Sequence, residues 1–162
     1  MLAADLAAAK ALIEKHEGRR AWVYRDSLGI PTIGVGFNLQ RDDAQALVEA
    51  SGADFSQVRA GETSLTEDQI DYILDECINE CLTDLQKLFP NFDQMPREAQ
   101  LVLLDLRFNL GPQTLRSFRL TLASFKAARY HKAAALLEPT RWARQVGKRA
   151  VEDIAMLRRI PE

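Results

Sequence analysis

The chain has 162 residues, of which 47% are hydrophobic and 27% charged, and its formal net charge at pH 7 is −2. This length suits one domain, or two small lobes that share a core, and the composition is that of a globular protein rather than a disordered one. The first residues include Asp5 and Lys10 and contain no long apolar run, so we expect neither a secretory signal nor a membrane-spanning segment.

The charge is unevenly distributed along the chain. Residues 40–96 carry a net charge of −10, and residues 97–162 carry a net charge of +7. The basic C-terminal part would suit an anionic polymer, although solvated helix faces explain most of these charges more simply. A helical nucleic-acid binder is the weaker alternative because the cations are scattered and no reading motif is present. We therefore expect no nucleic-acid partner.

The first predicted elements are a helix and a β-hairpin. Residues 3–16 are rich in alanine with leucines near helical spacing, and Gly18 suits the end of that helix. Gly34 and Gly36 interrupt the end of the hairpin, which indicates that another backbone or a ligand approaches closely there. The expected strand, turn, returning strand and third short strand lie at residues 22–24, 27–31, 32–35 and 37–39.

Two carboxylates and a hydroxyl along this stretch, Glu17, Asp26 and Thr32, suggest glycosidase chemistry. Cleavage of a glycosidic bond needs one protonated carboxylic acid and a second, ionised group that activates water or stabilises positive charge on the sugar. Glu17 is the better acid because apolar neighbours at a helix end disfavour its charged form. Asp26, on a polar turn, would stay ionised, and Thr32 would hold a water near it. On spacing alone, solvated surface carboxylates are the commoner explanation.

Helices dominate the rest of the chain. Thr66 and Gln69 form a capping box, and behind it an apolar stripe with an acidic opposite face predicts one long helix that ends before Pro90. Residues 53–64 are expected to form a loop. Further helices are predicted at residues 41–50, 97–110, 114–128, 130–137, 140–146 and 148–159, the second of them apolar on nearly all sides and therefore buried.

The two cysteines lie four residues apart on the long helix. Intrahelical geometry rarely suits a disulfide, so we interpret Cys77 and Cys81 as buried, reduced thiols. With no further cysteine and no nearby histidine, we predict no metal site.

The hairpin sequence resembles the signature of phage-type lysozymes. The pattern E-G-x-R-x-x-x-Y-x-D, a five-residue gap and T-I-G-x-G is carried here by Glu17, Gly18, Arg20, Tyr24, Asp26 and residues 32–36. The resemblance implies that Glu17 is the proton donor and that Asp26 and Thr32 position the attacking water. Phe37 stands where histidine is usual in the family, and we expect it to contact substrate.

The resemblance extends to the C-terminal part of the chain. It implies that Phe108 and Asn109 contact sugar at the edge of the substrate cleft, and that Arg149 supports Glu17. Considered without the resemblance, Phe108 would be a core residue and Arg149 an exposed arginine in a first helical turn. Leu136 replaces a polar amide of the family, so that contact with substrate is not expected here.

The resemblance implies an α+β, mainly α, lysozyme-like fold in which a long helix joins a β-hairpin lobe to a helical lobe. Residues 1–162 would form one lysozyme domain, with a small lobe of about 14–65 and a helical lobe of about 1–13 and 66–162. The expected reaction is hydrolysis of the β-1,4 bond between N-acetylmuramic acid and N-acetylglucosamine, with inversion because Thr32 favours attack by water. No cofactor is implied.

The expected biological role is that of a phage or prophage endolysin. Its partner would be the glycan strands of peptidoglycan, with no stable membrane insertion. The protein would act as a monomer, held in the host cytoplasm until a separate holin-type protein lets it reach the cell wall in the periplasm. The alternative is a catalytically inactive peptidoglycan-binding module on a lysozyme scaffold, because folds are reused for other functions.

Overall fold

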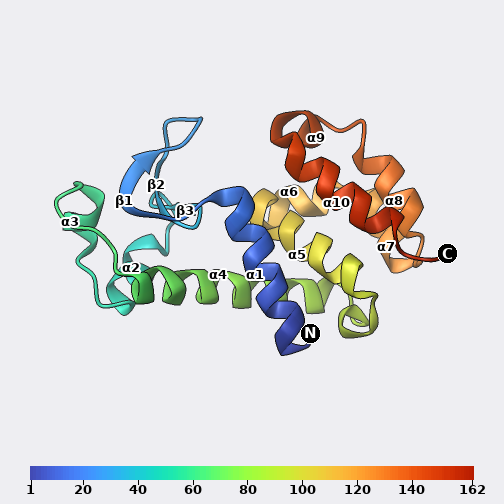
Figure 1. Ribbon diagram of the computed structural model, residues 1–162, viewed down its shortest axis with the longest axis horizontal. Helices are drawn as coiled ribbons and strands as arrows, with labels where there is room; N and C mark the ends of the chain where they lie inside the picture. Colours follow the sequence, from blue (N-terminus) through green and yellow to red (C-terminus); the bar gives the residue numbers. More distant parts are fainter. The chain divides into compact units, whose positions relative to one another are not determined.

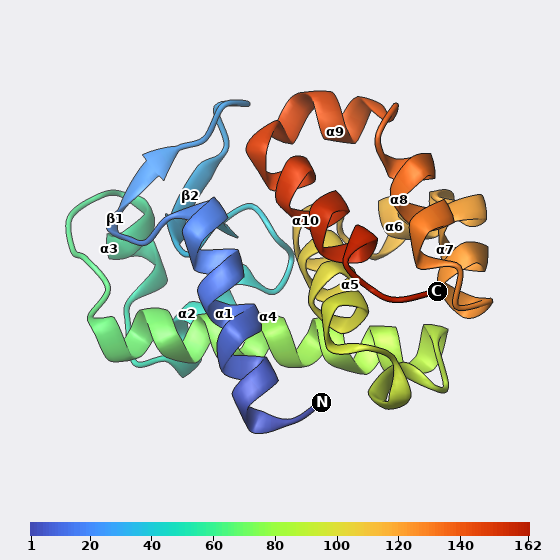
Figure 2. The ribbon, with the colours of Figure 1, turned by 45° about the vertical axis from the view of Figure 1, so that its right-hand side comes forward.

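The computed structural model describes all 162 residues as ten α-helices, one short 3₁₀ helix and a three-stranded antiparallel sheet (Figures 1 and 2). This confirms the predicted α+β, mainly α fold. In chain order the elements are α1 (Ala3–Glu17), β1 (Arg20–Arg25), β2 (Pro31–Gly34), β3 (Phe37–Asn38), α2 (Ala44–Ala50), α3 (Phe55–Arg59), α4 (Glu67–Leu88), η1 (Phe92–Gln94), α5 (Arg97–Leu110), α6 (Pro112–Ser117), α7 (Arg119–Lys126), α8 (Tyr130–Leu137), α9 (Arg141–Val146) and α10 (Lys148–Arg158).

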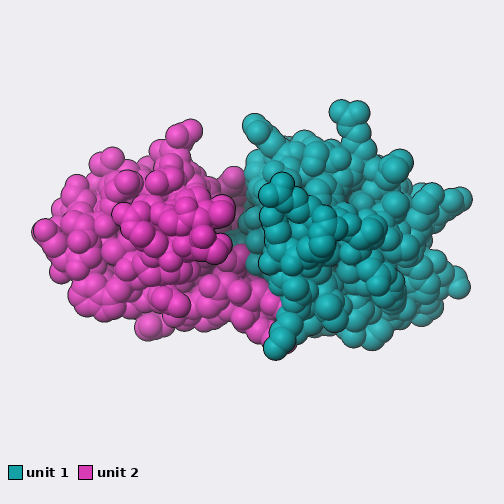
Figure 3. All heavy atoms as spheres, turned by 90° about the horizontal axis from the view of Figure 1, so that it is seen from above, with its two compact units in different colours: residues 1–10, 81–162 teal, residues 11–80 magenta.

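The chain divides into two compact units, coloured separately in Figure 3. Unit 1 consists of residues 1–10 and 81–162, and unit 2 consists of residues 11–80. Helices α1 and α4 each cross the division, so each contributes one end to either unit. Unit 2 is longer than the predicted small lobe of about 14–65, because it also includes residues 11–13 of α1 and residues 67–80 of α4.

The sheet is the centre of unit 2. Its order is β1-β2-β3, with Tyr24 opposite Thr32 across β1 and β2, and with Ile33 opposite Phe37 across β2 and β3. Every residue of β2 is buried. Helix α3 packs beside β1 (Figure 1). A Cβ added at Gly34 would lie 3.5 Å from a methyl carbon of Ile70, so β2 lies close to the start of α4.

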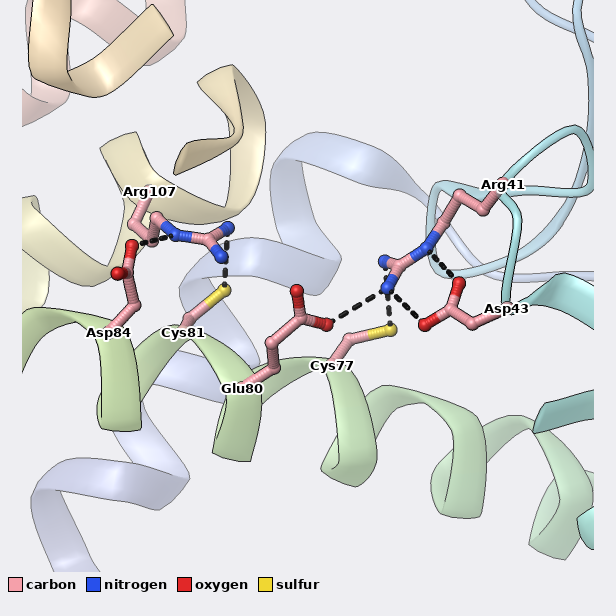
Figure 4. A network of polar contacts seen from close by, with 7 residues as sticks. All are labelled: Arg41, Asp43, Cys77, Glu80, Cys81, Asp84 and Arg107. Carbon is pink, nitrogen blue, oxygen red and sulfur yellow. Dashed lines mark hydrogen bonds and ion pairs between the residues drawn. The ribbon is translucent and has the colours of Figure 1, made fainter. Parts of the chain in front are cut away.

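An arginine fixes the loop after the sheet to α4 within unit 2. Figure 4 shows the Arg41 guanidinium between Asp43 and Glu80, with N–O distances of 2.8 and 2.9 Å, and 3.6 Å from the sulfur of Cys77. Burial raises the pKa of the Cys77 thiol to about 11, against the opposing influence of Arg41. The thiol therefore stays protonated at neutral pH and acts as a packing group.

A similar contact fixes α5 to the C-terminal end of α4 within unit 1. The Arg107 guanidinium donates to Asp84 at 2.7 Å and lies 3.7 Å from the sulfur of Cys81 (Figure 4). Arg116 binds the same carboxylate, and the two cations, Arg116 foremost, lower the pKa of Asp84 to about 2. Both cysteines are buried and unbridged, which confirms their predicted burial.

The core of unit 1 is built around α5. Seven consecutive residues from Leu101 to Arg107 are buried, which confirms the prediction of a central helix, and α10 packs on α5, α8 and α9. The most deeply enclosed charges form one cluster. Arg149 donates two hydrogen bonds to Asp105 at 2.7 and 2.8 Å, and Asp153 lies beside them with no exposed surface.

Some of the predicted helix boundaries agree with the structure, and others differ from it. The capping box before α4 is confirmed, since Thr66 N–H donates to the Gln69 side chain at 2.9 Å and Gln69 N–H donates to the Thr66 hydroxyl at 3.2 Å. The predicted loop over residues 53–64 is wrong in part because it contains α3, which the Asp54 side chain caps. The single helix predicted over 114–128 is two helices, α6 and α7, divided at Phe118, where ψ is +56°.

The buried cluster predicts an unusual dependence of stability on pH. Burial raises the pKa of Asp153 well above its usual range, and the neighbouring Asp105 carboxylate adds to this effect. The unfolded chain therefore releases the Asp153 proton at a lower pH than the folded chain. The stability that the protonated Asp153 carboxyl contributes is fully present below the unfolded pKa and is lost as pH rises through the folded pKa.

Asp153→Asn should remove this loss of stability at high pH, because asparagine has the same shape and stays neutral. We expect its melting temperature at pH 8 to exceed that of the wild type by several degrees, at about 2–4 °C per kcal/mol for a chain of this size. The difference should shrink toward zero near pH 4, as scanning calorimetry across this range would measure. A wild-type melting temperature above that of the variant at pH 8 would contradict the assignment.

Candidate active site

Glu17 is the last residue of α1, and an arginine network fixes that end of the helix. Gly18 takes a φ of +79° and ends the helix, as its sequence position indicated. The next residue, Arg19, binds Glu67 at 2.7 Å and Asp71 at 2.9 Å at the start of α4, and lies 3.5 Å from Glu14 in the last turn of α1. Arg19 thereby holds the end of α1 against α4.

The Glu17 carboxyl packs directly against the backbone of Gly36. A Cβ built at Gly36 would overlap Oε2 of Glu17 and lie 2.9 Å from its Cδ, closer than real Cβ atoms approach. Gly36 also has a φ of +61°, in the left-handed region that favours glycine. The close approach predicted from the glycines of this segment is therefore made by a side chain, that of Glu17.

Asp26 and Thr32 are both hydrogen-bonded to the backbone of one residue, Ile30. The Asp26 carboxylate accepts hydrogen bonds at Oδ1 from the backbone N–H groups of Leu28 at 2.8 Å and Ile30 at 2.9 Å. The carbonyl of Ile30 accepts from the Thr32 hydroxyl at 2.9 Å and from the backbone N–H of Asp26 at 3.0 Å. The hairpin turn thus fixes the carboxylate and the hydroxyl relative to each other.

Tyr24 shows that the two carboxylates share one electrostatic neighbourhood. Burial raises the pKa of its phenol, the Arg20 cation opposes that rise, and the carboxylates of Glu17 and Asp26 both add to it. Tyr24 also pairs with Thr32 across the sheet.

The predicted substrate contact Phe37 lies in the same unit. It is buried on β3, opposite Ile33 of β2, and the Arg41 guanidinium lies over its ring, 5.4 Å from the centroid. Its contact with sugar stays a prediction.

The other predicted residues lie in unit 1. Phe108 is half-buried rather than a fully enclosed core residue, and Asn109 accepts a hydrogen bond from the Trp142 indole at 2.8 Å. That bond orients the Asn109 amide and leaves its N–H groups available as donors. Arg149 is buried, so the alternative of an exposed first-turn arginine is wrong. Its predicted support of Glu17 stays a prediction.

Neither a metal cluster nor a membrane-spanning helix is present in the fold. No three or more His, Cys, Asp and Glu side chains are grouped so that they could bind a metal ion. None of the helices combines the length and apolar character needed to span a bilayer.

Comparison with known proteins identifies the family. The family model described as phage lysozyme matches residues 14–162. The chain belongs to the phage lysozyme family. The matched residues include every residue of the candidate site.

Among curated proteins, the chain is similar to the pre-baseplate central spike protein Gp5 of Enterobacteria phage T4. The two are 25% identical over 146 residues, which cover 86% of the chain and 25% of the spike protein. The chain therefore spans about a quarter of the length of the curated relative it matches.

Some residues that shape the site were not found from the sequence. Asp105 is 44 positions from Arg149, and nothing in the local pattern of either residue indicates their pairing. Arg19 lies within the signature segment, but its partners Glu67 and Asp71 lie on a distant helix. Gly36 did give a signal, since a glycine within a strand indicates a close neighbour.

Gly36→Ala tests the position of Glu17. The added Cβ would displace the Glu17 carboxyl, so we expect a loss of lytic activity of about 100-fold, comparable to the effect of moving a catalytic group by about 1 Å. The left-handed backbone would cost a further 1–2 kcal/mol of stability, roughly. Turbidity assays and thermal melts would measure the two effects.

Gly52→Ala is the matched control. Gly52 has a φ of +96°, yet its added Cβ would make only an ordinary contact with Gln69, 3.7 Å away. This variant should lose similar stability and keep its activity. Equal loss of activity in both variants would show that backbone strain, and not displacement of Glu17, causes the defect.

Proposed function

We propose that this phage lysozyme is a muramidase that hydrolyses the β-1,4 bond between N-acetylmuramic acid and N-acetylglucosamine in peptidoglycan. The observation that carries the proposal is the arrangement of Glu17, Asp26 and Thr32 around one hairpin of unit 2, with the first carboxyl against Gly36 and the other two groups joined through Ile30. Two carboxyl groups in different surroundings are what glycoside hydrolysis requires.

The two carboxyl groups have different surroundings. Asp26 accepts two backbone hydrogen bonds, and both go to Oδ1, so Oδ2 can bind water. The Thr32 hydroxyl donates a hydrogen bond to the Ile30 carbonyl and can accept a hydrogen bond from the same water. Glu17 would then donate its proton to the leaving oxygen. Attack by this water would invert the anomeric carbon.

Residues of unit 1 and Phe37 would contribute to substrate binding. Phe108 would offer an apolar surface to a sugar ring, and the Asn109 amide, oriented by Trp142, would donate to sugar hydroxyls. Arg149 would support Glu17, with its guanidinium orientation set by the two hydrogen bonds to Asp105. No cofactor forms part of the proposal.

The biological setting follows from the proposed substrate. Peptidoglycan lies outside the inner membrane, so we propose an endolysin that accumulates in the host cytoplasm, acts as a monomer and reaches the periplasm through a separate holin-type protein. The charge of +7 on residues 97–162 would favour approach to the anionic wall.

Glu17→Gln tests the acid. The amide is isosteric and cannot donate the proton, so the rate of release of new reducing ends from purified peptidoglycan should fall at least about 100-fold. Loss of turbidity of outer-membrane-permeabilised Gram-negative cells should fall in parallel, with the thermal melt unchanged. Turnover at the wild-type rate would remove Glu17 from the mechanism. Wall binding by both proteins without cleavage by either would favour an inactive binding module.

Asp26→Asn separates the chemical role of Asp26 from its role in the turn. Asparagine keeps an Oδ1 that accepts from Leu28 and Ile30, so the hairpin should fold normally, but it lacks the charge that activates water. We expect activity to fall by at least about 100-fold with little loss of stability. Asp26→Ala should lose both activity and stability. An active Asp26→Asn with an inactive Asp26→Ala would show that Asp26 is only a turn residue.

A further inference from the structure

An exposed tryptophan lies on the edge strand that carries the candidate site. Trp22, in the middle of β1, is 54% exposed, whereas Trp142, the second tryptophan of the chain, is 5% exposed. Large aromatic side chains normally bury most of their surface, so an exposed tryptophan on a rigid strand indicates a binding role.

Trp22 is exposed to solvent on β1. The next side chain, Val23, is half-buried and lies 3.5 Å from the Cβ that Gly61 would carry. The register of β1 against β2 shifts between Arg20 and Tyr24, so the strand is irregular where it carries Trp22. Arg20 and Trp22 are both exposed, and they lie two residues apart on this edge strand.

Tyr24 connects Arg20 to the candidate site. The Arg20 guanidinium lies over the Tyr24 ring, 4.3 Å from its centroid. Tyr24 is paired with Thr32 across β1 and β2, and β1 is followed directly by Asp26. Arg20, Trp22 and Tyr24 therefore lie on the strand that leads from Glu17 to Asp26.

Arg20 differs from its neighbour Arg19 in having no carboxylate partner. Arg19 binds three acidic residues and is structural, whereas Arg20 stacks on an aromatic ring and is exposed. A guanidinium held flat on a ring keeps its N–H donors at its edge, available to a ligand.

We propose that Trp22 and Arg20 form an accessory saccharide-binding surface on β1, which extends the muramidase site proposed above and rests on that proposed function. A pyranose ring of the N-acetylated glycan strand stacks its C–H face on the Trp22 indole. Arg20 donates hydrogen bonds to an acetamido carbonyl or a carboxylate of the same strand. The occupant is a polysaccharide because a flat exposed indole matches a sugar ring and lies on the strand that connects Glu17 with Asp26.

Binding should be measured without catalysis, in the Glu17→Gln protein. The probe is peptide-free glycan strands from amidase-treated sacculi, titrated by calorimetry. Trp22→Ala and Trp22→Leu should each weaken binding at least about fivefold, the loss that separates an energetically important interface residue from a neutral one, while Trp22→Phe should restore most of the affinity. Tyr72→Ala, which removes a 39% exposed aromatic side chain from α4 of the same unit, should leave the affinity unchanged.

A spectroscopic readout would exclude a merely structural role. The two tryptophans give two indole N–H resonances, assigned with Trp22→Phe, and that of Trp22 should shift as glycan is added. An affinity of Trp22→Ala within about twofold of the parent, or an equal loss in Tyr72→Ala, would overturn the proposal. So would binding to phosphatidylglycerol vesicles that depends on Trp22 while glycan binding does not, which would assign the surface to a membrane.

The results that would refute the accessory surface differ from those that would refute the proposed muramidase function. An active Glu17→Gln, or a wild type that releases no reducing ends, would refute the muramidase assignment whatever the role of Trp22. Normal catalysis with unchanged affinity in the Trp22 variants would refute only the accessory surface.

Discussion

The contact on which the candidate site depends is that of the Glu17 carboxyl with the backbone of Gly36. It requires a residue without Cβ at a left-handed φ of +61°, and it requires that the end of α1 be fixed beside the sheet. Arg19 meets the second requirement by binding Glu14, Glu67 and Asp71. The spacing between Glu17 and the glycines of the return segment therefore has a physical cause, because backbone and carboxyl must meet at one point.

The backbone of a single residue, Ile30, fixes Asp26 and Thr32 in a comparable way. The N–H of Ile30 donates to the carboxylate and its carbonyl accepts from the hydroxyl, so the turn that closes the hairpin also orients both groups. Unit 1 uses a similar arrangement around Arg149, whose two hydrogen bonds to Asp105 fix a buried cation. There Asp153 adds a second buried carboxyl. Because its pKa is raised, this cluster makes the fold less stable as the pH rises.

The sequence predicted those features whose signals are local. The capping box of α4 and the apolar α5 depend on residues within a few positions of one another, and both were found. Helix α3 was missed because it has only five residues, although Asp54 at its start is a capping residue. The break at Phe118 carries neither proline nor glycine and so gave no signal. The pairing of Arg149 with Asp105 needs the tertiary fold, and the roles of Glu17, Asp26 and Thr32 came from the family signature rather than from spacing.

The most direct test of the proposed mechanism is a crystal structure of the Glu17→Gln protein with an uncleaved glycan fragment. It should place the glycosidic oxygen within hydrogen-bond distance of the amide introduced at position 17. A water held by Asp26 and Thr32 should lie on the opposite face of the sugar. A glycan bound away from position 17, or an Asp26 carboxylate in direct contact with the anomeric carbon and no water between them, would contradict the mechanism.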